Sequence, residues 1–182
     1  MGQINQPVPV MLLLALFSRH EGALDWARQR GIQTWGPLAL ASEVFAFEET
    51  DYYTASMGEG LKKQFFVFEK FIDPARLPEI KHQTNQWELD YKDSQNWPEQ
   101  RPLNLDPGYL TEAKLVLAST KDHHHRLYLS QGIFAECTLH YQSKKWQSRP
   151  WTYPDYQRAD FQEFFTRCRE YLRERIRSGQ AR

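Results

Sequence analysis

The sequence predicts a single α+β domain over residues 1–182, with a ferredoxin-like βαββαβ core and an appended short helix, β-hairpin and long C-terminal helix. Two observations predict this class. Segments with strand or helix signals follow the order strand, helix, strand, strand, helix, strand, which is that of the split βαβ arrangement. A chain of 182 residues is also long enough to bury one core without disulfides or metals.

The first half of the core is predicted from apolar runs. Residues 8–17 form a continuous apolar run, which is typical of a buried strand. A capping-box pattern at Ser18 starts a helix that Gly31 is expected to end. Residues 38–47 and 61–71 are apolar enough for a second and a third strand. These segments supply the strand, helix, strand and strand that open the predicted order.

The second helix of the core begins with Asp73 and Pro74, which suit the N-cap and N1 positions. Pro78 favours a 3₁₀-like first turn and a regular helix over residues 78–91. The helix has an apolar stripe that is expected to be buried. The polar side chains, which we expect to meet solvent, are those of Lys81, Asn85 and Glu88.

The remaining elements are predicted from local signals. Residues 102–105 form a short strand, and Asp-Pro-Gly at 106–108 is a turn signal. A threonine that can cap favours a short helix over residues 111–118. A long amphipathic helix is expected over residues 160–177.

A β-hairpin is predicted around Ser-Gln-Gly at residues 130–132. A three-residue loop with Gly132 in the left-handed conformation keeps apolar side chains on one face. That register pairs Leu129 with Ile133 and Leu127 with Ala135.

The same register places Arg126 opposite Glu136 on the other face of the hairpin. One interpretation is an exposed cross-strand ion pair that contributes roughly 0 to 1 kcal/mol. The other is a guanidinium that a carboxylate orients toward an anionic ligand. The hairpin alone favours the exposed pair.

The candidate site lies within residues 104–156, where polar side chains that carry out chemistry are concentrated. Arg donors, a Lys charge and hydroxyl groups near a turn suit a phosphate or carboxylate, although a solvated loop also fits. The predicted ligand-binding residues are Lys121, Arg126, Glu136, Thr120, Lys114, Tyr53, Tyr109, Tyr153 and Asn104. The candidate acid–base residues are His125, Asp106 and Asp155.

Two of these assignments have structural alternatives. Asp106 can act as a general base or form an Asx turn, and the turn is favoured. The aromatic segment at residues 151–156 can be a lid over a ligand or a plug that docks the terminal helix. Both interpretations of that segment remain open.

Composition excludes several classes of function. Lys plus Arg equals Asp plus Glu at 23 each, so a broad nucleic-acid surface is not expected. The apolar run at residues 8–17 is far shorter than the roughly 20 residues that span a bilayer. It also lacks the flanks of a signal peptide, so a cytoplasmic protein is expected.

Three consecutive histidines at residues 123–125 suggest a metal site. No second ligand cluster stands at a known spacing, so no metal is expected. The sequence indicates no particular cofactor.

Several motifs of the chain together resemble those of domain-of-unknown-function family 4416, a group of uncharacterised bacterial proteins. They are NLDPGYL at residues 104–110, KLVLAST at 114–120 and TYPDY at 152–156, with shorter motifs between residues 50 and 139. The resemblance spans nearly the whole chain and implies no activity. It implies that only the third histidine of the triplet, His125, belongs to the family pattern.

The sequence therefore predicts a small protein that binds an anionic, phosphate- or nucleotide-like molecule in a pocket built from residues 104–156. Whether it is an enzyme is left open. The alternative is a non-catalytic protein–protein interaction module that uses the TYPDY segment and the C-terminal helix.

Overall fold

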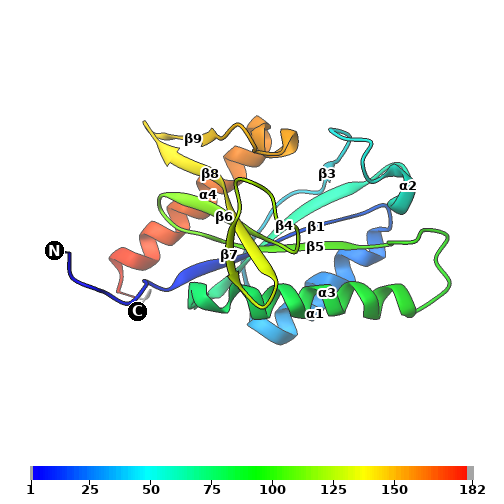
Figure 1. Ribbon diagram of the computed structural model, residues 1–182, viewed down its shortest axis with the longest axis horizontal. Coiled ribbons are helices and arrows are strands. Elements are labelled where there is room, and N and C mark those ends of the chain that lie inside the picture. The colour runs from blue at the N-terminus through cyan, green and yellow to red at the C-terminus, as the bar shows by residue number, and fades with distance from the viewer. Residues whose placement is uncertain (1, 180–182) are drawn as a thin grey trace.

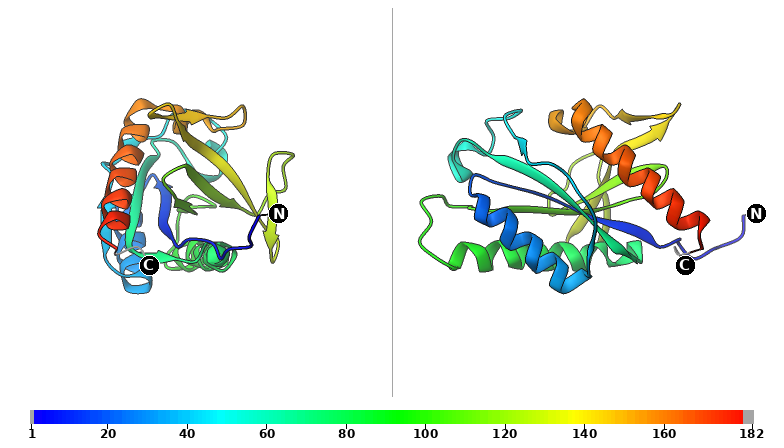
Figure 2. Two further views of the ribbon diagram at one scale, coloured as in Figure 1. Left: turned by 90° about the vertical axis from the view of Figure 1, so that its left-hand side faces the viewer. Right: turned by 180° about the vertical axis from the view of Figure 1, so that it is seen from behind.

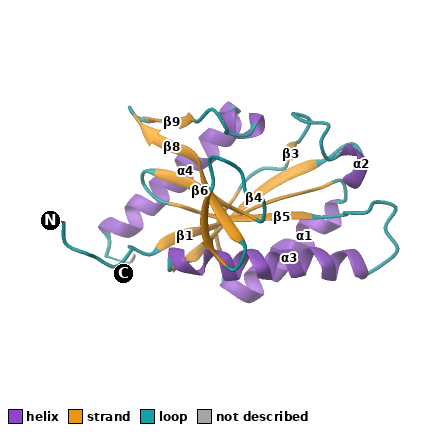
Figure 3. Cartoon of the chain, in the orientation of Figure 1, coloured by secondary structure: helices purple, strands orange, loops and turns teal. Residues whose placement is uncertain are grey.

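A nine-stranded antiparallel sheet organises residues 2–179, the part of the chain that the computed structural model describes (Figures 1 and 3). The strand order is β2-β4-β1-β5-β6-β8-β7, while β3 pairs with β4 and β9 pairs with β8. The strands are β1 (Val10–Ser18), β2 (Leu38–Ala41), β3 (Phe45–Ala46), β4 (Lys62–Ile72), β5 (Asn104–Leu110), β6 (Lys114–Ser119), β7 (Leu127–Ser130), β8 (Ile133–Gln142) and β9 (Lys145–Ser148).

The helices cover both faces of this sheet. They are α1 (Glu21–Trp35), α2 (Thr54–Met57), α3 (Leu77–Asp93) and α4 (Ala159–Arg177), with 3₁₀ turns η1 (Pro74–Arg76) and η2 (Pro154–Gln157). The apolar residues of α1 and α3 share one buried cluster, and those of α4 belong to another. Figure 1 shows α1 and α3 side by side below the central strands, with α4 on the left.

The central strand β1 explains why both faces must be covered. All nine of its residues are buried. Leu12, Leu14 and Leu16 face the cluster of α1 and α3, whereas Met11 and Leu13 face that of α4. Burial of one such side chain contributes roughly 1.5–3 kcal/mol, so a strand apolar on both faces recruits helices to both.

The structure confirms the mixed α and β class, and its sheet is larger than the predicted core. Figure 2 shows the sheet continuing beyond the central strands, and β9 packs against α4. The predicted ferredoxin-like core stays a prediction. β5 continues through residues 106–108, where the sequence predicts a turn, and β6 replaces the helix predicted at 111–118, so both expectations are wrong.

The Asp-Pro-Gly sequence at residues 106–108 lies inside β5 rather than in a turn. Pro107 pairs with Leu14 of β1, and Gly108 pairs with Leu117 of β6. A Cβ atom on Gly108 would lie 2.2 Å from the carbonyl oxygen of Val116. The glycine therefore permits a close approach of two strands, which overrides its turn propensity.

The turn lies instead at Thr111, whose Oγ1 accepts hydrogen bonds from the backbone N–H groups of Ala113 and Lys114. These bonds close a short turn and cap no helix. The following run of Leu115 to Ala118 is fully buried as β6, because both faces of that strand are covered.

The helix α1 begins and ends later than predicted. Its N-cap is His20, and Ser18 instead hydrogen-bonds to the Pro102 carbonyl oxygen. Gly31 lies within the helix, and Gly36 with a φ of 93° forms the C-cap. A Cβ on Gly31 would lie 2.8 Å from the Cζ atom of Phe68, so this glycine brings α1 close to β4.

The variant Gly31→Ala is therefore expected to lower the free energy of unfolding by about 1–3 kcal/mol, because Phe68 is fully buried and cannot yield space. Gly22 lies in the same helix with no atom near its Cβ position. The control Gly22→Ala should raise the free energy of unfolding by about 0.4–1 kcal/mol. Urea titration measures both variants, and equal effects would contradict the packing argument.

Two further predicted elements differ in detail. Residues 38–47 form two short strands, β2 and β3, rather than one. The β7–β8 hairpin closes with a two-residue loop, Gln131 and Gly132, at φ values of 53° and 75°. Leu127 pairs with Ala135 as predicted, but Ser130 rather than Leu129 pairs with Ile133. A register shift between Tyr128 and Ser130 accommodates the change in pairing. The shorter loop forms because two successive residues with positive φ suit the twist of a tight hairpin.

Candidate functional site

A cavity of about 900 Å³ lies between α3 and β5 on one side and β6, the loop before β7 and η2 on the other. We call it the central cavity. Its volume is within the range of small-molecule sites. Nine residues of the sequence-predicted site line it: Tyr53, Asn104, Asp106, Thr120, Lys121, Arg126, Glu136, Tyr153 and Asp155.

The other three predicted residues, His125, Lys114 and Tyr109, are not among those that line the cavity. His125 lies behind Glu136, where its Nε2 is 3.0 Å from Oε2 and its ring stacks on Trp151. Lys114 is exposed at the opposite end of β6 from the cavity. Tyr109 packs against the buried clusters of the sheet because it faces away from Asp106 along β5.

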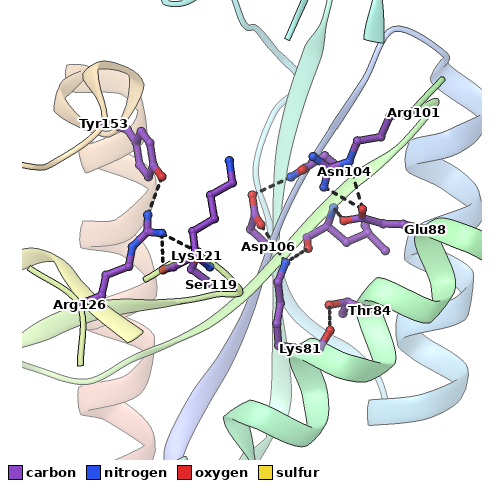
Figure 4. Close-up of polar contacts among 11 residues, drawn as sticks. Lys81, Thr84, Glu88, Arg101, Asn104, Asp106, Ser119, Lys121, Arg126 and Tyr153 are labelled. Carbon is purple, nitrogen blue, oxygen red and sulfur yellow. Dashed lines mark hydrogen bonds and ion pairs between the residues drawn. The ribbon is translucent and has the colours of Figure 1, made fainter. Parts of the chain in front are cut away.

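One wall of the cavity is built around Asp106. Its Oδ1 accepts a hydrogen bond of 3.0 Å from Lys81, and its Oδ2 accepts one of 2.6 Å from Asn104 (Figure 4). Burial alone would raise the pKa of Asp106, but the Lys81 charge and these hydrogen bonds lower it below its usual value. The carboxylate is therefore ionised and fixed in position, with no Asx turn.

The polar face of α3 forms part of this wall, so the expectation that it meets solvent is wrong. Lys81, Asn85 and Glu88 all line the cavity. Lys81 is buried and also donates to the Leu105 carbonyl oxygen at 2.9 Å. Glu88 accepts from the Leu105 backbone N–H at 2.7 Å and from Arg101 at 2.8 Å, and burial raises its pKa. The strand β5 packs against the polar side of α3, which the sequence pattern predicts to be exposed to solvent.

The opposite wall contains the Arg126–Glu136 pair, with a 2.8 Å bond from Nε to Oε2. The predicted juxtaposition is confirmed, but both side chains are buried rather than exposed. The guanidinium also donates to Ser119 Oγ at 2.7 Å and to Tyr153 Oη at 2.8 Å. Burial opposes the charge, but the hydrogen bonds and the Glu136 charge raise the pKa of Arg126. Arg126 is thus a rigid cation that joins β6, β8 and η2.

Lys121 differs from the other cations of the cavity. Lys63, Lys81, Arg101 and Arg126 each form an ion pair with a lining carboxylate. Within residues 2–179, the ammonium group of Lys121 has no carboxylate partner and donates a hydrogen bond only to Tyr52 Oη, at 3.0 Å. Figure 4 shows its side chain extending into the space between Tyr153 and Asp106. Its ammonium can therefore turn to an incoming anion without breaking an ion pair.

The floor of the cavity is a buried ion pair between Lys63 of β4 and Asp155 of η2. The Lys63 ammonium also lies 4.4 Å from the ring centre of Tyr156 and 4.9 Å from that of Phe47. Asp155 is consequently held by a cation that aromatic rings surround. The pair fastens η2 to the sheet.

The aromatic segment at residues 151–156 docks the terminal helix, as one of its two interpretations predicts, and it also lines the central cavity. Tyr156 is buried against Phe65 and Phe165, so it docks α4 onto the sheet. Tyr153 and Pro154 line the central cavity. Burial raises the pKa of Tyr153, although the Arg126 charge opposes this shift, so its hydroxyl stays protonated.

Sequence reasoning missed Lys63 and Arg101. Lys63 has the same strand parity as Leu61, Phe65 and Val67, and a lone lysine on a buried strand face signals a buried ion pair. Arg101 lies in a polar loop, and no local pattern distinguishes it from a solvated residue. Figure 4 shows it beside Glu88 and Asn104.

Residues 2–179 hold no group of three or more His, Cys, Asp or Glu side chains that could bind a metal ion. None of the helices described combines the length and the apolar character needed to cross a membrane.

Comparison with known proteins agrees with the motif resemblance. No curated protein and no solved structure matches the chain. A family model described as "Domain of unknown function (DUF4416)" matches residues 8–171, which include every wall of the central cavity. The chain therefore belongs to the DUF4416 family.

Proposed function

We propose that this protein binds an anionic small molecule, phosphate- or nucleotide-like, in the central cavity. The observation that carries the proposal is the position of Lys121, a cation with no carboxylate partner among residues 2–179, on the wall that holds Arg126. An anion placed there gains the Lys121 charge and the remaining N–H group of a guanidinium that is already oriented.

The lining of the cavity supports a molecule larger than a simple anion. Tyr52, Tyr53 and Tyr153 supply aromatic surface next to Lys121, and Thr120 supplies a hydroxyl group. Aromatic rings and a charged group together suit a ligand with a planar or sugar portion beside its phosphate. This combination favours a nucleotide or a sugar phosphate over inorganic anions.

The three acid–base candidates differ in their access to such a ligand. His125 lies outside the cavity lining, and the carboxylate of Asp155 is engaged by Lys63. Asp106 is open to the cavity, but its lowered pKa makes it a weak base near neutral pH. The geometry therefore supports binding, with Asp106 as a hydrogen-bond acceptor.

The test is a thermal-shift panel of nucleotides, sugar phosphates and carboxylates on the wild type and on Lys121→Ala. A ligand at about a hundred times its dissociation constant adds roughly 2.7 kcal/mol. For a chain of this size that raises the melting temperature by about 5–10 °C. Lys121→Ala should lose most of this shift, because it removes the lining cation that has no carboxylate partner within residues 2–179.

The matched control is Lys114→Ala, because Lys114 begins β6, the strand that leads to Lys121, and is exposed away from the cavity. It should keep the full ligand-induced shift. A panel in which no anion stabilises the wild type, or in which both variants respond alike, would exclude the proposal.

The alternative interaction module has weaker support. It requires the TYPDY segment and the C-terminal helix to present an apolar docking surface. Tyr156, Phe161, Phe164 and Phe165 are instead buried against the sheet, and only Tyr153 and Ile176 of these segments expose large apolar side chains.

We also propose that β1, α1, β2, β4, α3 and β5 form a ferredoxin-like unit within the larger sheet. The antiparallel order β2-β4-β1-β5 supports this, because it is the order in which the split βαβ arrangement places its four strands. β6 to β9 and α4 would then be the additions that close the cavity.

A further inference from the structure

The two walls of the central cavity present different groups to a ligand. Figure 4 shows Arg126, Tyr153 and Lys121 on one side, and Asp106 with Asn104 and Lys81 on the other. The first wall presents the cation without a carboxylate partner. The second presents a carboxylate, Asp106, and its cations Lys81 and Arg101 are already engaged in ion pairs, so the two walls favour different chemical groups.

Asp106 is the most exposed of the acids that line the cavity. Its side chain is 33% exposed, whereas those of Asp155 and Glu136 are 4% and 2% exposed. The side chains of Glu49 and Glu88 are 24% and 13% exposed and are held by Arg158 and Arg101. Each of the two oxygens of Asp106 accepts one hydrogen bond within the protein, yet a carboxylate offers about four acceptor sites. Two sites thus stay open toward the cavity.

An open carboxylate that is ionised accepts hydrogen bonds and donates none. Hydroxyl or amino groups satisfy it, whereas a phosphate next to it would meet like charge. Asn104 and Lys81 each take one acceptor site of Asp106, and a ligand in the cavity can supply donors for the remaining sites. The Asp106 wall therefore selects a polar group that carries hydrogen-bond donors.

We infer that the ligand is a phosphorylated sugar, free or as part of a nucleotide, whose phosphate lies at Lys121 and whose hydroxyl groups donate to Asp106. This inference rests on the proposed function and assigns its ligand class. A simple anion contacts one wall only, and a sugar without phosphate contacts the other only. A sugar phosphate contacts both.

Isothermal titration calorimetry with the full chain tests this assignment through inorganic phosphate, ribose, ribose 5-phosphate and adenosine 5′-monophosphate. Ribose 5-phosphate should bind wild type at least about tenfold more tightly than phosphate, because hydrogen bonds to a charged group are worth roughly ten- to hundredfold in affinity. Adenosine monophosphate binding more tightly than ribose 5-phosphate assigns the sugar to a nucleotide, and the reverse order assigns a free sugar phosphate.

Asp106→Asn should remove the preference for ribose 5-phosphate over phosphate while leaving phosphate affinity unchanged or higher. Lys121→Ala should weaken both ligands. Circular dichroism establishes that each variant is folded, and the wild-type comparison decides alone if Asp106→Asn is not. Equal wild-type affinity for phosphate and ribose 5-phosphate, or an unchanged preference in folded Asp106→Asn, overturns the inference and leaves anion binding standing. If no phosphate compound binds, both proposals fail.

Discussion

Replacing Lys63 with methionine will lower the free energy of unfolding by about 3–5 kcal/mol, because it leaves the buried carboxylate of Asp155 without its cation. Both side chains are almost fully enclosed, so water cannot replace the lost partner. Methionine fills most of the volume of lysine, which separates the effect of charge from that of a cavity. Equilibrium unfolding in urea measures the difference.

The double variant Lys63→Met/Asp155→Leu separates this explanation from a loss of packing. Replacing both members of a buried ion pair with apolar residues is often neutral or stabilising. The double variant should therefore recover most of the lost stability, which is a coupling that a double-mutant cycle detects. If the two substitutions are simply additive, Lys63 and Asp155 do not depend on each other as the geometry requires.

The variant Gly108→Ala will destabilise the protein by at least about 3 kcal/mol, because its Cβ would lie 2.2 Å from the Val116 carbonyl oxygen. The obstructing atom belongs to the backbone of β6, so relief requires the strands to move apart. A shift of β6 would also displace Ser119 and Lys121, so ligand-induced stabilisation should fall in the same variant. Urea titration and the thermal-shift panel report the two effects.

A second substitution shows which atom causes the loss. The added Cβ would also lie 2.8 Å from Cδ2 of Leu117, a side chain that can be shortened. Adding Leu117→Ala to Gly108→Ala should restore nothing, because the backbone clash remains. Recovery of stability in the double variant would place the conflict in the side chain instead.

The elements with strong periodicity could be predicted from the sequence. β1 and β4 are runs of apolar residues, and α3 and α4 have separated apolar and polar faces. Such patterns reflect burial over many residues, so one unusual neighbour does not alter them. The Asp-Pro-Gly sequence depends on three residues only, and its pairing with β1 and β6 outweighs its turn propensity.

The candidate site could be predicted in part, because its residues cluster between positions 104 and 156. The environment of those residues could not. The hairpin pattern alone predicts that Glu136 and Arg126 form an exposed pair. Their partner Tyr153 belongs to a later segment, and no pattern in the hairpin predicts that this segment packs beside them. Lys81 reads as solvent-facing for the same reason, since β5 covers it only in the folded chain.

The ion pair at the cavity floor also sets an order of assembly. Lys63 and Asp155 lie 92 positions apart in the chain. At synthesis rates of 5–20 residues per second, Lys63 is made roughly 5–20 s before its partner. The β1–β4 part of the sheet can form during that interval, but the central cavity cannot be completed. Its wall at residues 153–156 is added only after that segment has left the ribosome.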